Sequence, residues 1–304
     1  MQAIVIKSTG SWYTVKTVKN QIFSCRLKGK FRKENIKSTS PVVVGDIVSI
    51  QKQGQSWLIT EIKERKNFIV RKSVKLSKQE HIIASNIDQA ILMVTIENPI
   101  TTTEFIDRFL AAAQSHSVPV VIIFNKLDIY NSTSLKEQQE LYKVYTRIGY
   151  TCIAMSVLHD SLLKVKSVMV NKVNLIAGHS GVGKSTLINN LQPGLDLPTK
   201  VISESHKQGQ HTTTFSELYD LDFGASVIDT PGIRGFGLFD IMQGELGDYF
   251  CDFFTFKKDC KFNNCIHVNE PNCAIKDAVE EGRIYRSRYI NYLSMLEEEK
   301  TYRR

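Results

Sequence analysis

The stretch "VNLIAGHSGVGKSTLINNL", residues 173–191, decides the central fold of this 304-residue chain. Its first residues are typical of a buried strand and its last of a helix. Between them, "GHSGVGKS" has the spacing of a phosphate-binding loop, in the strand, loop and helix setting that such a loop requires. Glycines let backbone N–H groups turn toward phosphates, while Lys184 brings positive charge to the β and γ phosphates and the Ser185 hydroxyl can ligate Mg²⁺. Lys184 is therefore also a candidate catalytic residue. The predicted nucleotide-binding residues here are Gly178, His179, Ser180, Gly181, Val182, Gly183, Lys184, Ser185 and Thr186.

Strands and helices alternate around this loop. Apolar runs predict buried strands at residues 90–96, 118–125, 151–156 and 173–178. Helical spacing predicts helices at 101–116, 134–149 and 161–170. Such alternation is the pattern of a parallel α/β domain, which we expect to span residues 87–240.

Two further motifs follow the phosphate loop. "VIDTPG" (227–232) places Asp229 at a strand end, where its carboxylate can hold Mg²⁺, and Gly232, whose N–H can meet the γ-phosphate. "HTTT" (211–214) lies between the two motifs, where a mobile loop could offer a hydroxyl from Thr213 or Thr214 to the metal. The predicted magnesium ligands are Ser185, Thr213, Thr214 and Asp229.

The tetrapeptide "NKLD" (125–128) predicts which base is bound. The Asp128 carboxylate can accept two hydrogen bonds from guanine, whereas adenine has no matching donors on that edge, so GTP should be preferred to ATP. Asn125, Lys126 and Leu127 complete this loop, and Ser156 follows the next strand, where it can also contact guanine. A P-loop ATPase or small-molecule kinase is the alternative, and "NKLD" argues against it.

The order of these motifs is unusual, because the base-reading loop precedes the phosphate loop by about fifty residues. The parts of a GTPase domain are present, but the chain is cut between the "DTPG" and "NKLD" motifs and rejoined elsewhere. Compact domains tolerate such a circular permutation because their ends lie close together at the surface. The segment after "DTPG" then leads directly into the C-terminal region.

The N-terminal segment is strongly basic. Residues 1–75 hold 16 Lys and Arg against four acidic residues, a balance of +12, whereas the whole chain carries +8. Short β-branched runs predict a small OB-like barrel over residues 1–72, followed by a linker at 73–86. The charge favours RNA binding over a merely solvated surface. Three aromatic residues could stack on bases or fill the core: Trp12, Tyr13 and Phe31.

Four potential metal ligands crowd into fourteen residues of the C-terminal region, for which we expect a zinc-binding, helical domain at 241–304. Cys260, Cys265, His267 and Cys273 predict a closed structural Zn²⁺ site of the Cys₃His kind. A chance cluster and a redox role are the alternatives. The remaining cysteines are scattered among apolar residues and are predicted to be buried.

The chain shows no apolar stretch of membrane-spanning length and no signal-peptide pattern at its N-terminus. A soluble cytoplasmic protein without a membrane partner is therefore expected.

The combination of motifs closely resembles the RsgA family of circularly permuted, YjeQ-like GTPases. The resemblance covers nearly the whole chain: the basic OB-like domain, the permuted GTPase domain and the Cys, Cys, His, Cys element. It implies a cytoplasmic factor, expected as a monomer, that binds the small (30S) ribosomal subunit and its 16S rRNA near the decoding region. It also implies a role in late subunit maturation, with GTP hydrolysed to GDP and phosphate faster on the subunit. The switch regions depart from the usual pattern of this family at two positions. Gln210 replaces a usual Arg, and Gly235 replaces a residue that is commonly acidic.

The residue after "DTPG" is Ile233, where many GTPases carry a water-orienting Gln. An aliphatic side chain cannot orient water, so intrinsic hydrolysis should be slow, nearer ~10⁻⁴ s⁻¹ than assisted rates. His211 is the candidate catalytic residue that positions water once the loop closes, although it could equally steer phosphate or be solvated. A GTP-gated RNA-binding scaffold, with hydrolysis as the release step, is a second alternative. Gly181 replaces the Asn common in potassium-dependent GTPases, so no potassium site is predicted.

Overall fold

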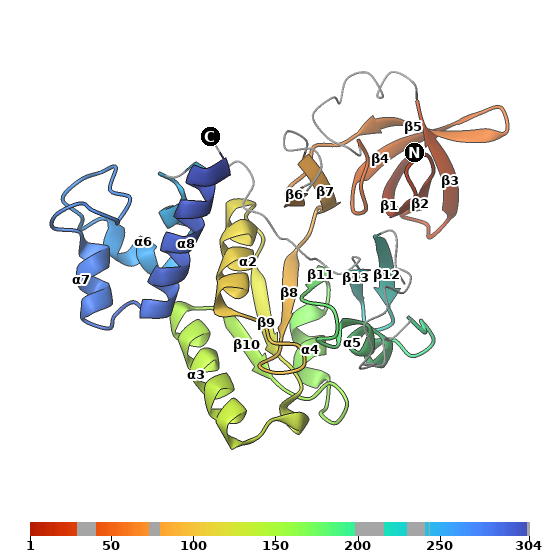
Figure 1. The fold of residues 1–304 in the computed structure, drawn as a ribbon. Helices are drawn as coiled ribbons and strands as arrows, with labels where there is room; N and C mark the ends of the chain where they lie inside the picture. The colour runs from red at the N-terminus through yellow and green to blue at the C-terminus, as the bar shows by residue number, and fades with distance from the viewer. Residues whose placement is uncertain (29–40, 73–79, 198–215, 230–240, 243, 303–304) are drawn as a thin grey trace.

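The computed structural model describes residues 1–28, 41–72, 80–197, 216–229, 241–242 and 244–302. They form an N-terminal barrel, a central sheet with helices on both faces, and a C-terminal group of helices (Figure 1). This arrangement confirms the predicted multidomain fold class. Within the described ranges, no helix is both long and apolar enough to cross a membrane.

The barrel consists of β1 (Gln2–Ser8), β2 (Tyr13–Thr17), β3 (Ile22–Leu27), β4 (Ile47–Gln53) and β5 (Ser56–Ile62). The strands pair in the order β1-β2-β3-β5-β4, and β4 returns to β1, which closes the barrel. All pairs are antiparallel except β3 with β5. Alternate residues point inward, and Val5, Val15, Cys25 and Ile59 are fully buried. This alternation is the period of two that strands with one face on a core adopt, and the predicted N-terminal barrel is confirmed.

A hairpin follows the barrel, formed by β6 (Phe68–Lys72) and β7 (Glu80–Ser85). β7 lies inside the segment predicted as a linker, so that prediction must be corrected for residues 80–85. The reason is burial: Ile82 and Ala84 pack inward, and Ala84 bridges to Val44 beside the barrel. The polar residues that precede these two hide the short apolar alternation in the sequence.

Gly45 holds the hairpin close to the barrel. Its φ is +92°, and a Cβ at this position would lie 2.0 Å from the Ser85 carbonyl oxygen. The neighbouring Asp46 is fully buried and accepts hydrogen bonds from the Ser85 hydroxyl (2.6 Å) and from Arg65 (2.7 Å). This contact requires glycine, because any side chain would force the two backbones apart.

The central domain contains six strands: β8 (Gln89–Val94), β9 (Val120–Phe124), β10 (Thr151–Ala154), β11 (Val173–Ala177), β12 (Glu217–Leu221) and β13 (Ala225–Asp229). Their order in the sheet is β10-β9-β8-β11-β13-β12, and only β12 runs antiparallel to its neighbour in this domain. β8 is buried at every position, as expected for a strand covered on both faces.

Helices cover both faces of this sheet. α2 (Thr103–Ser115) and α3 (Ser132–Ile148) pack on one face, with Phe109 and Tyr145 among the buried residues. α4 (Leu163–Met169) and α5 (Lys184–Leu191) pack on the other. Asn131 caps the start of α3, and Gly149 ends that helix in the left-handed conformation. The domain is therefore a doubly wound α/β sheet.

The barrel and the central sheet are continuous. β1 pairs with the edge strand β12 through Lys7 and Glu217, whose side chains also form a salt bridge (2.8 Å). The result is one eleven-stranded sheet that includes both domains. The β12 edge of the central sheet is thus covered by the barrel instead of facing solvent.

The C-terminal part contains η2 (Leu246–Tyr249), α6 (Cys251–Lys257), α7 (Ala274–Glu280) and α8 (Arg286–Tyr302). α8 lies alongside α2 of the central domain (Figure 1). Arg288 is buried at this seam, where it donates to Asp107 on α2 (2.6 Å) and to Asp252 on α6 (2.7 Å). A buried ion-paired network therefore joins the two domains.

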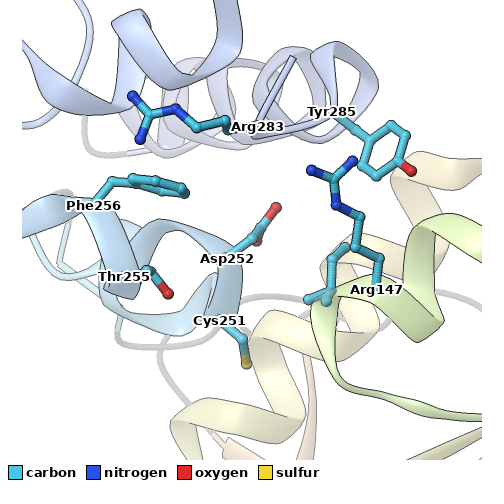
Figure 2. A pocket seen from close by; sticks show the side chains of 8 residues that line it. Arg147, Cys251, Asp252, Thr255, Phe256, Arg283 and Tyr285 are labelled. Atoms are coloured by element: carbon cyan, nitrogen blue, oxygen red, sulfur yellow. The ribbon is translucent and has the colours of Figure 1, made fainter. Parts of the chain in front are cut away.

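A cavity of about 280 Å³ lies between the end of α3 and the C-terminal part, where residues of α6 also line it. Figure 2 shows Arg147 from α3 beside Tyr285, and Arg283 above Phe256 from α6. Each guanidinium lies over its aromatic ring, at 5.6 Å for Arg147 and 4.7 Å for Arg283. The Arg147 pair extends the contact between α3 and the C-terminal part, whereas the Arg283 pair lies within that part.

Candidate functional site

The phosphate loop connects β11 to α5, as the sequence predicts. Its glycines adopt positive φ values, +139° at Gly178, +87° at Gly181 and +105° at Gly183. A Cβ at Gly178 would lie 2.4 Å from the Met93 carbonyl oxygen, and one at Gly183 would lie 2.5 Å from the Asn125 amide. The glycines are therefore required by backbone conformation and by close packing as well as by phosphate binding.

Lys184 folds back over this loop. Its ammonium donates to the carbonyl oxygens of Gly178 (2.8 Å) and His179 (2.7 Å). Burial lowers the pKa of Lys184 to about 8, and the nearby Asp229 carboxylate opposes this shift. A buried ammonium held by carbonyl oxygens has a strong preference for an anion, so a phosphate is the ligand that this position fits.

The predicted metal position combines Ser185, the second residue of α5, with Asp229, the last residue of β13. β13 runs parallel to β11, and Asp229 pairs with Ile176 immediately before the loop. The Asp229 side chain is 6% exposed at this strand end. A hydroxyl and a carboxylate beside a phosphate loop are the oxygen ligands that Mg²⁺ prefers. The two predicted ligands that the structure describes, Ser185 and Asp229, therefore fit the metal.

Asn125 connects the three nucleotide loops, and its side chain is 3% exposed. The amide nitrogen donates to the Val182 carbonyl of the phosphate loop (2.8 Å). The amide oxygen accepts from the Val157 backbone N–H of the serine loop (2.9 Å). The asparagine side chain therefore joins the base-reading loop to the other two loops and holds them in register with it.

Lys126 and Leu127 shape the rest of this loop. Lys126 adopts a left-handed conformation (φ +69°), its ammonium donates to the Asn98 carbonyl, and burial lowers its pKa. Leu127 begins the short helix η1 (Leu127–Ile129), which contains Asp128. The loop thus turns sharply between β9 and η1.

Two groups at the base end of the site have hydrogen-bonding capacity to offer a ligand. The Ser156 hydroxyl is buried, with no hydrogen-bond partner within the described ranges. The Asp128 carboxylate is 22% exposed, and Nε2 of His159 lies 3.9 Å from its Oδ2. An unsatisfied buried hydroxyl and an accessible carboxylate fit a base with two adjacent N–H donors, as guanine has in its N1–H and 2-amino groups, whereas adenine has no donor at N1 or C2.

Two residues at this end of the site belong to no motif in the sequence. Asp160 accepts a hydrogen bond from the Ser156 backbone N–H (2.7 Å), which fixes the serine loop. His159 stands beside Asp128. Both residues follow Ser156 within four positions, and this part of the sequence matches no recognised motif. Only the fold shows that they lie at the site.

Several predicted site residues lie outside the described ranges. They are the candidate catalytic His211, the switch residues Thr213 and Thr214, and Gly232. The same holds for Phe31, Gln210, Ile233 and Gly235.

The predicted zinc ligands converge. Ligand atoms of Cys260, Cys265, His267 and Cys273 all lie within 4.8 Å of one another. The Cys260 sulfur is 3.7 Å from His267 Nδ1 and 4.0 Å from the Cys273 sulfur. Ligands at about 2.3 Å from a tetrahedral Zn²⁺ stand roughly 3.5–4 Å apart, so the separations of Cys260 from His267 and Cys273 match such a site and the cluster is close to the size that the ion requires.

The surroundings of the cluster hold its loop in place. Glu270 accepts from the backbone N–H groups of Ile266 (2.8 Å) and Val268 (2.9 Å). Tyr289 of α8 donates to the His267 carbonyl (2.6 Å), and Tyr292 donates to the Ile266 carbonyl (2.7 Å). Such partners orient metal ligands, and they tie the cluster to the helix that packs on α2.

The barrel separates the two aromatic candidates that the structure describes. Tyr13 is 3% exposed and belongs to the core. Trp12 is 42% exposed, and the Arg26 guanidinium lies 4.1 Å from its ring centroid. An exposed indole with a stacked cation is the surface feature that single-stranded nucleic acid binds on OB folds.

Comparison with known families decides the identity of this fold. The family model described as RsgA GTPase matches residues 62–239, which is more than half of the chain, and the RsgA N-terminal domain matches residues 2–57. The chain belongs to the RsgA GTPase family. As a family member it is a GTP-hydrolysing enzyme, which confirms the prediction from the sequence.

Known proteins resemble this RsgA-family chain over its whole length. "Small ribosomal subunit biogenesis GTPase RsgA" from Flavobacterium psychrophilum is 53% identical over 100% of this chain and 95% of its own. The protein of the same name from Flavobacterium johnsoniae is 55% identical, with the same coverage. Among solved structures, YjeQ from Thermotoga maritima has a TM-score of 0.79 and 34% identity, covering 98% of this chain and 97% of its own.

A second solved structure bears on the motif order. YloQ, described as a circularly permuted GTPase, has a TM-score of 0.75 and 30% identity, and covers 99% of this chain and 95% of its own. The predicted circular permutation is thereby confirmed for this RsgA-family chain.

Proposed function

We propose that this GTPase binds the small ribosomal subunit and assists its late maturation, and that the subunit accelerates hydrolysis of GTP to GDP and phosphate. The relatives named above are small-subunit biogenesis GTPases that match the chain from end to end. The exposed Trp12 and Arg26 pair on a basic barrel supports a contact with the 16S rRNA. The protein is then a cytoplasmic factor, and we expect it to act as a monomer.

The convergence of the nucleotide loops on Asn125 is the observation that carries the enzymatic part of the proposal. Guanine is read by Asp128 and Ser156, and the phosphates lie on the loop from Gly178 to Thr186. Lys184 neutralises charge that develops on the β and γ phosphates, which stabilises the transition state of phosphoryl transfer.

Magnesium is assigned to Ser185 and Asp229, with Thr213, Thr214 and the Gly232 N–H completing the phosphate end. When bound, the ion supplies charge neutralisation at the phosphates. His211 is assigned the role of orienting the attacking water, since Ile233 has no group that can do so. A structural Zn²⁺ is assigned to Cys260, Cys265, His267 and Cys273, which form a closed site without a coordination position for substrate.

Base selection tests the nucleotide site directly. Replacing Asp128 by Asn removes the acceptor for the two guanine N–H groups, so GTP affinity should fall by at least about a hundredfold. The Asn amide can instead donate to the 2-carbonyl of xanthine, so affinity for xanthosine triphosphate should rise. Unchanged GTP affinity in Asp128→Asn would remove this carboxylate from base recognition.

GTP turnover with and without purified small subunits, with ATP as the control, tests the proposed partner. We expect slow hydrolysis of GTP alone and an increase of several orders of magnitude with the subunit. Fast hydrolysis by the free protein, or no response to the subunit, would contradict the proposed partner and leave the GTPase assignment intact.

A further inference from the structure

The phosphate loop contacts a residue, Phe105, that belongs to none of the nucleotide-binding motifs. The His179 ring lies against the Phe105 ring, with centroids 3.9 Å apart and planes at 33°. Phe105 belongs to the first turn of α2, where its backbone N–H is capped by the Thr102 hydroxyl (3.2 Å). A ring in such close contact limits where the outer side of the loop can move.

The next turn of the same helix faces the C-terminal domain. Asp107 is 1% exposed, and its two carboxylate oxygens accept from Arg288 (2.6 Å) and from Asn291 (2.6 Å), both on α8. Tyr145 of α3 donates to the same carboxylate (2.8 Å). Buried, multiply bonded charge of this kind admits little displacement, because any shift leaves a polar group unsatisfied.

A second link from α8 reaches the residue beside Phe105. Glu104 accepts a hydrogen bond from the Ser294 hydroxyl of α8 (3.1 Å) and from Arg108 one turn further along α2 (3.1 Å). Two consecutive turns of α2 are thus attached to α8, while the first of them also carries the ring that touches the phosphate loop.

From these contacts we infer that Phe105 is a positioning residue of the phosphate loop, and that α8 determines the position of Phe105 through Asp107 and Glu104. The inference rests on the nucleotide site proposed above. Its consequence is that displacement of the C-terminal domain changes nucleotide binding through α2, and this effect requires no contact between that domain and the nucleotide. The coupling is reciprocal, so bound nucleotide also biases the position of α8.

The dissociation rate of a fluorescent GDP analogue from the full-length protein tests whether Phe105 positions the phosphate loop. Phe105→Ala should raise the dissociation rate by about three- to tenfold, the range expected for loss of one aromatic pair. Phe105→Tyr keeps the ring and should behave as wild type. Phe254→Ala is the matched control, because Phe254 is 70% exposed on α6 and should leave the rate unchanged.

A double-mutant cycle tests whether α8 acts on the phosphate loop through Phe105. Asp107→Asn should raise the dissociation rate about two- to fivefold when Phe105 is present, and should have no further effect in Phe105→Ala, since the contact that transmits the change is gone. Ser294→Ala serves as a milder second variant if Asp107→Asn does not fold, and the same non-additivity is expected.

Each outcome has one meaning. A wild-type rate in Phe105→Ala would overturn the positioning role. Equal effects of Asp107→Asn, or of Ser294→Ala, in both backgrounds would overturn the connection through α2 and leave Phe105 in place. Failure of the wild-type protein to bind guanine nucleotide would instead contradict the proposed function itself.

Discussion

Asn125 offers the sharpest test of how the nucleotide site is built. Asn125→Ala removes both hydrogen bonds that join the three loops and leaves the Val182 carbonyl and the Val157 N–H without their partner. Each unsatisfied buried backbone group costs about 1–3 kcal/mol, so the loss in folding free energy should be about 2–6 kcal/mol. Affinity for GTP should fall as well, because the loops no longer share one geometry.

Asn190→Ala is the matched control for this change. Asn190 is exposed and donates a single hydrogen bond to the carbonyl of the same Val157 (2.9 Å), so its loss should cost about 1 kcal/mol or less. Urea unfolding followed by circular dichroism gives both free energies, and titration with a fluorescent GTP analogue gives the affinities. If Asn125→Ala cost no more than Asn190→Ala, the reasoning that Asn125 unites the loops would be refuted.

Three further changes follow from the same structure. Burial holds the pKa of Lys184 near 8, so its positive charge is present below that pH and lost above it. GTP affinity should therefore fall by up to about tenfold per pH unit above 8, and calorimetry should detect proton uptake on binding. A GTP affinity that stays constant up to about pH 9.5 would contradict this. Gly45→Ala should destabilise the protein by about 3 kcal/mol or more, because a Cβ would meet the Ser85 carbonyl at 2.0 Å. Gly10→Ala, with a similar φ but open space around it, should cost about 1–2 kcal/mol in the same urea experiment. Cys265→Ser should lose zinc, measured as metal content per chain, and should lower the unfolding temperature; retention of zinc would remove Cys265 from the ligand set.

Local patterns predicted most of this fold. The alternation of buried residues in the barrel strands, the buried run of β8 and the loop between β11 and α5 are each contained within a dozen residues. The zinc cluster is similarly local, since all four ligands lie between residues 260 and 273. In these segments the chemistry and the spacing act over the same short range, so sequence alone is sufficient.

Features that join distant segments could not be predicted. Arg288 reads as one more cation on a polar helix, and only the fold brings it to Asp107, 181 residues earlier. Strand β7 contains two inward apolar residues among polar ones, a signal too short to separate from a linker. The contact of Phe105 with His179 likewise has no local signature, because aromatic residues on a helix are ordinarily part of the core.

The position of β8 in the sheet has a consequence for synthesis of the chain. β8 is a central strand, but its partner β11 lies 85 residues later, as the hydrogen bond from Gln89 to Asn174 shows. At about 5–20 residues per second, a ribosome needs roughly 4–17 seconds to make the intervening chain. During that interval β8 can pair with β9 on one side, but its other edge, which later pairs with β11, is open. The permuted order therefore leaves one edge of a central strand open until β11 has been made, and an open apolar edge is a template for pairing with another chain.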